Sequence, residues 1–486
     1  DPETKQICLF IEGIRKPEAF MRACGRALEA EKPIIAIKTG RSQKSREAAQ
    51  SHSGAVSGDY AGYEAVCERY GIINCETLEE MIEMTVGFQQ RRWPQGPRVA
   101  FMTTSGGTVD LLHDYCEEQG TSVPDLNEAT IEKIRPFVPS DCHIRNPIDT
   151  GAPVGKSGKS SPVEICKAFA SDPNVDIVAW CNNMPGSARS SGAEDEIIDL
   201  LKSTEKPVFS FARMPHQIPD GGLDFQKRTG MPFVQGTRIG VRVANALWFF
   251  SQRRGKTPIT PNDPKGEKDR CDGEALIDSL EQIGIQKPRS LMVQTPEDAG
   301  KAAAEIGFPV AVKIVSPQAS HKTEIGGVSL GIQNSENAKT AAFEMEGRLK
   351  SAQAESTVDG FLIQEMVSGV EVLVGARTDP LYGPMLVLGT GGTMVELIRD
   401  ISLSLLPVSE TQIRHMIANL KLKKQLAGWR GSPEADIDAL IKAILSLSTF
   451  YLDHRTWLKD IEINPLMVLP KGHGVRAVDV RTVLYN

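Results

Sequence analysis

Two serine–histidine pairs are followed by similar sequences. Ser51–His52 opens the segment SHSGAVSGD (51–59), Ser320–His321 opens SHKTEIGGV (320–328), and a glycine lies six residues beyond each histidine. A neutral imidazole is a competent nucleophile for covalent catalysis, and small neighbours leave it open to a reacting group. Most isolated histidines are structural or merely exposed, so neither motif alone identifies a catalytic residue. The repetition of the pattern favours a shared chemical role.

A lysine precedes the second pair. Lys313 lies in the apolar segment GFPVAVKIV (307–315), which is typical of a buried strand. A buried lysine needs a counter-charge, which a nucleotide phosphate would supply, and Gly326–Gly327 would let backbone N–H groups approach the same anion.

The loop GAPVGKSGKSS (151–161) is excluded as a P-loop, because three residues instead of four separate its first glycine from the Gly-Lys-Ser.

The segment LIQEMVSGVEVLVGARTD (362–379) fits the base and ribose end of a nucleotide site. One strand ends near Glu365 and Val367, and the next begins at Glu371. The backbone of Glu365–Val367 could pair with the edge of adenine, and Glu371 could bind ribose. An ordinary connection between two strands explains this segment equally well.

The segment DIEINPLMVLPKGHGVRAVDVR (460–481) predicts a magnesium site. Its two expected strands carry Glu462, Asn464 and Asp479 near a turn. Hard oxygen ligands on adjacent strands suit Mg²⁺, which bridges nucleotide phosphates and keeps several waters. Pro465 is expected to fix the end of the first of these strands. The alternative is a solvated hairpin whose acidic residues have no common task.

Composition limits the class of protein. The chain has 486 residues, a net charge of −7 and a pI near 5.8, which argue against a nucleic-acid partner. Its 9 cysteines form no CxxC pair and indicate reduced thiols, so we expect a cytoplasmic protein. No apolar run reaches the length of roughly 18 residues that a membrane span needs, and no membrane association is expected.

The order of elements predicts three domains. Short apolar runs alternate with amphipathic helical stretches in the first half, which indicates parallel sheets covered by helices. We expect two such α/β domains, at 1–92 and 93–254, followed by a polar linker at 255–273. The strands of residues 274–486 include antiparallel candidates, so this last domain is predicted to be α+β.

Taken together, the motifs resemble the NDP-forming (ADP-forming) acyl-CoA synthetase family. Residues 276–486 resemble its ATP-grasp module through VAVKIVSPQASHKTEIGGV, QEMVSGVEVLVGARTDPLYGPMLVLGTGG and DIEINPL. Residues 1–254 resemble its flavodoxin-like (succinyl-CoA-ligase-like) domains through LFIEGI, KTGRS, SHSGAVSGDYAGYEAV, TTSGGTVDLLHDYCEEQG and NPIDTGA. The resemblance covers nearly the whole chain.

The resemblance implies a reaction and a relay. A carboxylic acid, ATP and CoA would give an acyl-CoA, ADP and phosphate. ATP would phosphorylate His321, a moving segment would carry the phosphoryl group to His52, and His52 would pass it to the acid. Glu12 matches the carboxylate that fixes the His52 tautomer. The turn before a predicted helix would receive the phosphoryl group on backbone N–H groups; its residues are Ser105, Gly106, Gly107 and Thr108.

The nucleotide residues follow from the same resemblance. Lys313 would bind phosphates, Glu365 and Val367 adenine, Glu371 ribose, and Asn464 and Asp479 the magnesium ion. The family's CoA-binding region has no counterpart in the chain, and we expect it elsewhere in the same polypeptide. The 486 residues alone would then bind nucleotide without making acyl-CoA. A homo-oligomer, such as a dimer, is also expected.

Three other functions fit the sequence less well. A CoA-ligating lyase would cleave the acyl-CoA that it forms, and products of a substrate with a β leaving group would reveal it. A regulatory relative would lack one relay histidine, whereas His52 and His321 are both present. A carboxylate–amine ligase of the ATP-grasp type has no need of either motif.

Overall fold

The structure is a computed structural model that divides into two compact units, Asp1–Pro258 and Ile259–Asn486. It describes residues 1–42, 44–45, 60–151, 161–185, 194–215, 218–266, 270–316, 326–352, 357–392, 398 and 400–485. His52 and His321 both lie outside the described residues. No helix in the described ranges is long and apolar enough to cross a membrane.

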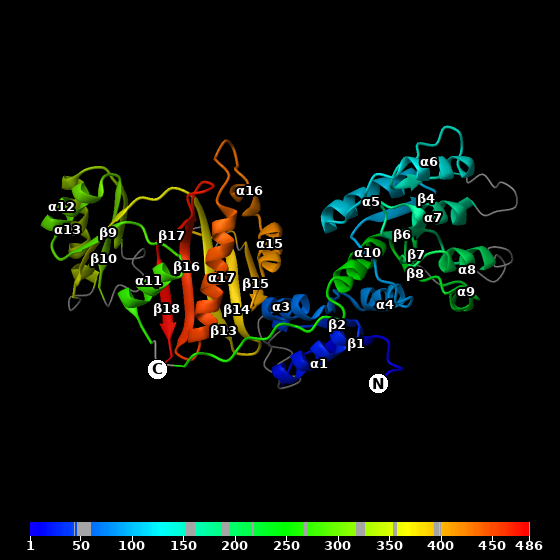
Figure 1. The fold of residues 1–486 in the computed structure, drawn as a ribbon, viewed down its shortest axis with the longest axis horizontal. Helices are drawn as coiled ribbons and strands as arrows, with labels where there is room; N and C mark the ends of the chain where they lie inside the picture. Colours follow the sequence, from blue (N-terminus) through cyan, green and yellow to red (C-terminus); the bar gives the residue numbers. More distant parts are fainter. Residues whose placement is uncertain are drawn as a thin grey trace. The chain divides into compact units, whose positions relative to one another are not determined.

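The first unit contains two parallel sheets (Figure 1), and the smaller one comes first in the chain. Its strand order is β1-β2-β3. Its elements are β1 (Ile7–Ile11), α1 (Pro17–Glu29), β2 (Ile34–Lys38), α3 (Tyr60–Tyr70), β3 (Ile73–Asn74) and α4 (Leu78–Gly87). Thr77 caps α4 by accepting a hydrogen bond from the Glu80 N–H, which explains where that helix begins.

The larger parallel sheet of this unit has the order β5-β4-β6-β7-β8, in which the direction of the connections reverses at β4. Its elements are β4 (Val99–Thr103), α5 (Gly106–Gln119), α6 (Glu128–Ile134), the 3-10 turn η1 (Arg135–Phe137), β5 (Ile148–Asp149), α7 (Ser161–Ser171), β6 (Ile177–Cys181), α8 (Glu194–Lys202), β7 (Val208–Ala212), α9 (Gly222–Thr229), β8 (Phe233–Gln235) and α10 (Thr237–Ser251).

Strands of the larger sheet are buried on both faces. Val99 and Phe101 of β4 pack on one side with Leu112 of α5 and Leu247 of α10. Ala100 and Met102 of the same strand pack on the other side with residues of α7 and α8. The first of these cores also includes residues of β2, β3 and α4, so the two sheets share hydrophobic packing. The division of this half at residue 92 therefore stays a prediction.

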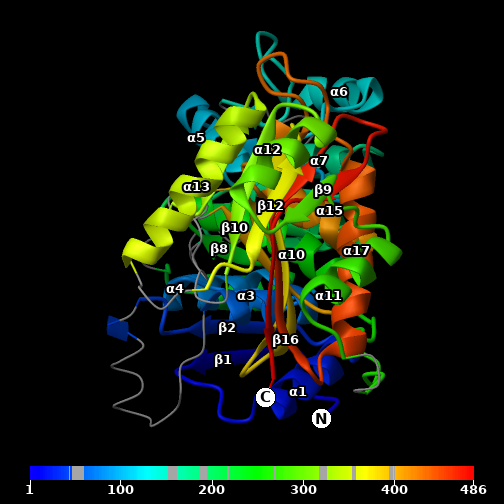
Figure 2. The ribbon, with the colours of Figure 1, turned by 90° about the vertical axis from the view of Figure 1, so that its left-hand side faces the viewer.

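The second unit contains two largely antiparallel sheets. The smaller has the order β11-β10-β12-β9, and α12 and α13 lie side by side over it (Figure 2). Its elements, with the preceding helix, are α11 (Gly273–Gln282), β9 (Ser290–Val293), α12 (Pro296–Ile306), β10 (Val310–Val315), β11 (Val328–Ile332), α13 (Ser335–Ala352) and β12 (Gly360–Glu365).

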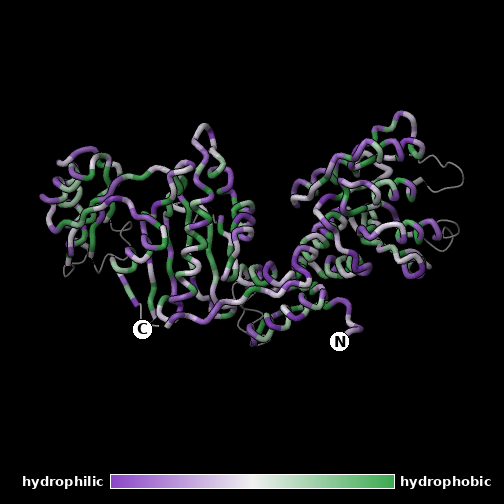
Figure 3. Tube along the Cα trace, in the orientation of Figure 1, coloured by the Kyte–Doolittle hydropathy of each residue, from purple (hydrophilic) through white to green (hydrophobic). Residues whose placement is uncertain are grey.

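The larger sheet has the order β15-β14-β13-β16-β17, and β18 also pairs with β16. Its elements are β13 (Val370–Asp379), β14 (Gly383–Thr390), β15 (Ile401–Leu405), α15 (Glu410–Asn419), α16 (Lys423–Leu426), α17 (Ile437–His454), β16 (Leu458–Val468), β17 (Val475–Ala477) and β18 (Val480–Leu484). In Figure 3 the hydrophobic residues concentrate along the strands of each unit, as packed sheets require.

The predicted fold class is confirmed: parallel α/β sheets are followed by an α+β unit. One local prediction was wrong, because β16 does not end at Pro465 but continues to Val468. The pairing of β13 with β16 shifts register between Val372 and Val374, which admits a residue without an N–H inside a paired strand.

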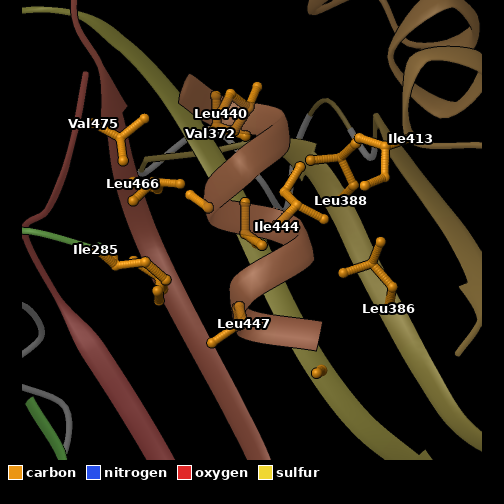
Figure 4. Close-up of a cluster of buried hydrophobic side chains, with 14 of the residues drawn as sticks. Ile285, Val372, Leu386, Leu388, Ile413, Leu440, Ile444, Leu447, Leu466 and Val475 are labelled. Carbon is orange, nitrogen blue, oxygen red and sulfur yellow. The ribbon is translucent and has the colours of Figure 1, made fainter. Parts of the chain in front are cut away.

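Helix α17 fastens the larger sheet. Figure 4 shows Leu440, Ile444 and Leu447 of this helix pointing at side chains of β13, β14 and β16. Ile444 and Leu447 are fully buried. This packing fixes which face of β16 is left for polar side chains.

We predict that Ile444→Ala lowers the free energy of unfolding of the second unit by about 2–5 kcal/mol, because it leaves a cavity between α17 and the sheet. Hydrogen exchange of the α17 amides in urea would measure the change within this unit. Thr449→Ala, at an exposed position of the same helix, should change it by less than about 0.5 kcal/mol. Equal effects of the two substitutions would contradict the packing argument.

Candidate functional site

The polar face of β16 carries Asn464, one of the two predicted magnesium ligands. Ile461 and Ile463 are fully buried in the core with α17, so the intervening Glu462 and Asn464 lie on the opposite face. Asp479 is exposed in the connection between β17 and β18, and its carbonyl oxygen accepts the Asn464 N–H at 3.0 Å. Asn464 and Asp479 are therefore neighbours, although Asp479 lies in a connection and not on a strand as the sequence predicted.

Lys313 reaches the same place from the smaller sheet. It lies on β10 with 8% of its surface exposed, and its Nζ donates a hydrogen bond to the Val478 carbonyl oxygen at 3.0 Å. Val478 is next in the chain to Asp479, so the ammonium group lies beside the predicted magnesium ligands. The fold thus gathers one cation and two oxygen donors that come from segments more than 140 residues apart in sequence.

Glu371 joins this group through a glycine. The Gly392 N–H donates to the Asn464 Oδ1 at 2.8 Å, and the Gly391 N–H donates to the Glu371 carbonyl oxygen at 2.9 Å. A Cβ atom at Gly392, where φ is +78°, would lie 1.7 Å from the Glu371 Oε2. The positive φ favours glycine at this position, and a Cβ atom would require the Glu371 carboxylate to move. Sequence reasoning missed this position, although the GTGG run after an apolar strand is a signal for close backbone approach.

The carboxyl groups of this face have altered acidity. Burial raises the pKa of Glu462, and the neighbouring Asp460 adds to the rise, while Arg481 opposes it. Burial likewise raises the pKa of Asp460 against the opposing charges of Arg377 and Arg481. A cation placed near Glu462 would favour its ionised form.

The group suits a magnesium ion bound partly by other ligands. In the described ranges no three His, Cys, Asp or Glu side chains cluster as a complete metal site. The Asn464 amide oxygen and the Asp479 carboxylate are hard donors, and Mg²⁺ typically takes its other ligands from water and phosphates. That Asn464 and Asp479 bind Mg²⁺ stays a prediction.

The predicted adenine segment begins where β12 ends. Arg289 binds the Glu365 carboxylate with its backbone N–H at 3.0 Å and its Nε at 2.7 Å. Burial opposes ionisation of Glu365, but these hydrogen bonds outweigh it and hold its pKa below the usual range. The Glu365 side chain is therefore committed to Arg289, and contacts to a base would have to come from the backbone near Glu365 and Val367.

The predicted phosphoryl turn lies at the carboxyl edge of the larger parallel sheet. Ser105 precedes α5 without capping it through its side chain, and Gly106, Gly107 and Thr108 form the first turn. A hollow of about 290 Å³ opens beside Gly106 and is also lined by His143, Arg145 and Asp149. Sequence reasoning did not single out His143 and Arg145, which directly precede the NPIDTGA motif.

Glu12 follows β1 at the edge of the smaller parallel sheet. Because β1 and β2 are parallel, with Ile11 opposite Lys38, both strands end at this edge. Residue 52 belongs to the connection between β2 and α3, which leaves the sheet at the same edge. The pairing of Glu12 with His52 involves a residue outside the described ranges and stays a prediction.

We predict that Lys313→Met weakens the binding of Mg–ADP about 10- to 100-fold, because it removes a charged donor from the phosphate end. Calorimetric titration would measure the affinity. Lys301→Met, which removes an exposed lysine from the adjacent helix α12, should leave it unchanged. Unaltered affinity in the Lys313 variant would refute its assignment to the phosphates.

Gly107→Ala tests the turn before α5. A Cβ at Gly107 meets no atom within 4 Å, so we expect the fold to gain about 0.4–1 kcal/mol of stability from the more restricted unfolded chain. If a phosphoryl group docks there, the methyl group should slow acyl-CoA formation about 10- to 100-fold through misplacement. Melting temperature and the rate of acyl-CoA formation would both be measured in the protein as the cell makes it, because these residues alone are not expected to make acyl-CoA. Gly347→Ala in α13, also free of contacts, is the matched control, and a Gly107 variant with unchanged turnover would contradict docking at this turn.

Parts of both halves of the chain are similar to known protein families. Residues 267–484 match the family model of an ATP-grasp domain, and residues 1–88 match that of a succinyl-CoA ligase like flavodoxin domain. The acetate–CoA ligase [ADP-forming] I of Archaeoglobus fulgidus is 29% identical over 503 aligned residues, which cover 100% of this chain and 70% of the relative.

Two further similarities concern parts of the chain. The beta subunit of acetate–CoA ligase [ADP-forming] II of Pyrococcus furiosus is 34% identical over 206 residues, which are 42% of this chain and 87% of the subunit. A structure of dinucleotide forming acetyl-coenzyme A synthetase 1 of Ca. Korarchaeum cryptofilum, in complex with coenzyme A, Ca-AMPCP and HgCl+, is 33% identical and covers 43% of this chain and 90% of its own, with a TM-score of 0.40. The chain belongs to the NDP-forming acyl-CoA synthetase family, as its sequence motifs indicate.

Proposed function

We propose that this chain is the phosphoryl-transfer part of an ADP-forming acyl-CoA synthetase, an acid–thiol ligase that uses ATP, Mg²⁺ and CoA. The observation that carries the proposal is the convergence of Lys313, Asn464 and Asp479 from two sheets. A buried cation beside hard oxygen donors suits the triphosphate of a nucleotide with its metal. Family membership supports the rest of the reaction.

The chemistry divides into three transfers. An imidazole nitrogen of His321 attacks the γ-phosphorus of ATP, so that an N–P bond forms and ADP leaves. The phosphoryl group then passes to His52 and from His52 to the carboxylate of the acid, which gives an acyl phosphate. The CoA thiol attacks the acyl carbon, loses its proton, and expels phosphate. Splitting one difficult condensation into these steps is the advantage of covalent catalysis.

The described residues have distinct tasks in this scheme. Lys313 offsets phosphate charge, and Asn464 with Asp479 would hold Mg²⁺, which neutralises charge on the phosphates when bound. The first turn of α5, with the backbone N–H groups of Gly106 and Gly107 and the positive end of the helix dipole, would receive the phosphoryl group near His52. Glu12 would accept a hydrogen bond from the second ring nitrogen of His52 and so fix its tautomer.

Three points about the whole protein belong to the proposal. The CoA-binding region lies in the same polypeptide outside these residues, and the A. fulgidus relative, of which this chain covers 70%, is correspondingly longer. The protein is a homo-oligomer. It is cytoplasmic, and all 9 cysteines, which lie in the described ranges, are unpaired, as is usual in a reducing compartment.

The relay makes a separable prediction for the two histidines. In the protein as the cell makes it, His52→Ala should abolish acyl-CoA formation but leave His321 able to take the γ-phosphoryl group of ATP. His321→Ala should abolish both. Incubation with γ-labelled ATP, followed by identification of the acid-labile phosphohistidine and assay of acyl-CoA, would measure the two steps. Normal turnover by the His52 variant would refute the relay.

A further inference from the structure

The end of β12 departs from regular antiparallel pairing. The register pairs Gln364 with Ser290, so Glu365 and Arg289 are the next pair along β12 and β9. In a hydrogen-bonded antiparallel pair, two residues exchange both of their N–H and C=O groups. Here the Glu365 N–H donates to the Arg289 carbonyl oxygen at 2.9 Å as expected, but the return bond is different.

The Arg289 N–H does not return to the Glu365 carbonyl oxygen. It donates instead to the Glu365 carboxylate, to Oε1 at 3.0 Å, and the Arg289 guanidinium holds the other oxygen, Oε2, at 2.7 Å. The Glu365 carboxylate thus accepts the Arg289 N–H that the Glu365 carbonyl oxygen would accept in a regular ladder. That carbonyl is thereby released from the ladder at the place where the sequence predicts contact with adenine.

The pair does little for stability. The Arg289 side chain is 70% exposed, and ion pairs that water screens contribute little to stability. Glu365 also continues the side of β12 that carries Phe361 and Ile363, which pack against α12 and α13. Lys313 pairs with Leu362 and lies on the opposite side of the sheet. The Glu365 carboxylate therefore points away from the phosphate-binding side and can act on a nucleotide only through the backbone.

We propose that Arg289 and the Glu365 side chain are positioning residues that select the base: by diverting the Arg289 N–H, they leave the Glu365 carbonyl oxygen free to accept a hydrogen bond from the 6-amino group of a purine. The selected ligand class is a 6-aminopurine nucleotide, and a 6-oxopurine, which presents an acceptor there, is disfavoured. This inference rests on the proposed nucleotide site.

Glu365→Ala tests the idea, because the Arg289 N–H would then return to the carbonyl oxygen of residue 365. We expect the dissociation constant for Mg–ATP to rise about three- to tenfold, the value of one hydrogen bond, with that for Mg–ITP unchanged. Glu365→Gln retains an acceptor for the Arg289 N–H and should preserve most of the preference. Both nucleotides would be titrated calorimetrically into the wild-type protein and each variant.

Glu410→Ala is the matched control, since it removes an exposed carboxylate that pairs with Arg414 at 2.8 Å in the same unit. It should leave the ratio of the two dissociation constants unaltered. An unchanged ratio in Glu365→Ala, or equal losses for both nucleotides, would overturn the inference and leave the proposed function in place. A wild-type protein that binds neither nucleotide would overturn the proposed function and this inference with it.

Discussion

The hydrogen bond from the Lys313 ammonium to the Val478 carbonyl oxygen joins the two sheets of the second unit at the point where their polar groups meet. A buried ammonium group is costly unless it is hydrogen-bonded and balanced by charge. The contact supplies part of this compensation, and a bound polyphosphate would supply more. Asp479 directly follows Val478, and its carbonyl oxygen accepts the Asn464 N–H. The Lys313–Val478 hydrogen bond therefore also sets the distance between the ammonium group and the oxygen donors of Asp479 and Asn464.

That arrangement depends on alternation along β16. Ile461 and Ile463 are held in the core by α17, so Glu462 and Asn464 have no choice of face. The register shift opposite Val372 and Val374 lets the strand continue through Pro465, which keeps Asn464 in the middle of a paired strand instead of at its end. The hydrophobic core therefore fixes the face of β16 on which Glu462 and Asn464 lie.

Sequence patterns predicted the strands because apolar runs are local properties, and motif order indicated nucleotide residues whose roles stay predictions. They could not predict that Gly392 would fill the space between Glu371 and Asn464, since that contact depends on how β14 and β16 flank β13. They were wrong about Pro465 because a bulge, which no local rule signals here, relieves the missing N–H. Arg289 was missed for a similar reason: it lies 76 residues from Glu365, and only strand pairing brings the two together.

The two ends of the proposed nucleotide site lie on neighbouring strands. Lys313 lies on β10, and Glu365 on β12 stands opposite Val310, three residues back along β10. At about 3.4 Å per residue this separates the phosphate end from the base end by about 10 Å. The spacing is set by the covalent geometry of one strand, so it cannot change without breaking the β10–β12 ladder. If the proposed nucleotide site is correct, the β10–β12 ladder therefore holds its base end and its phosphate end at a fixed spacing.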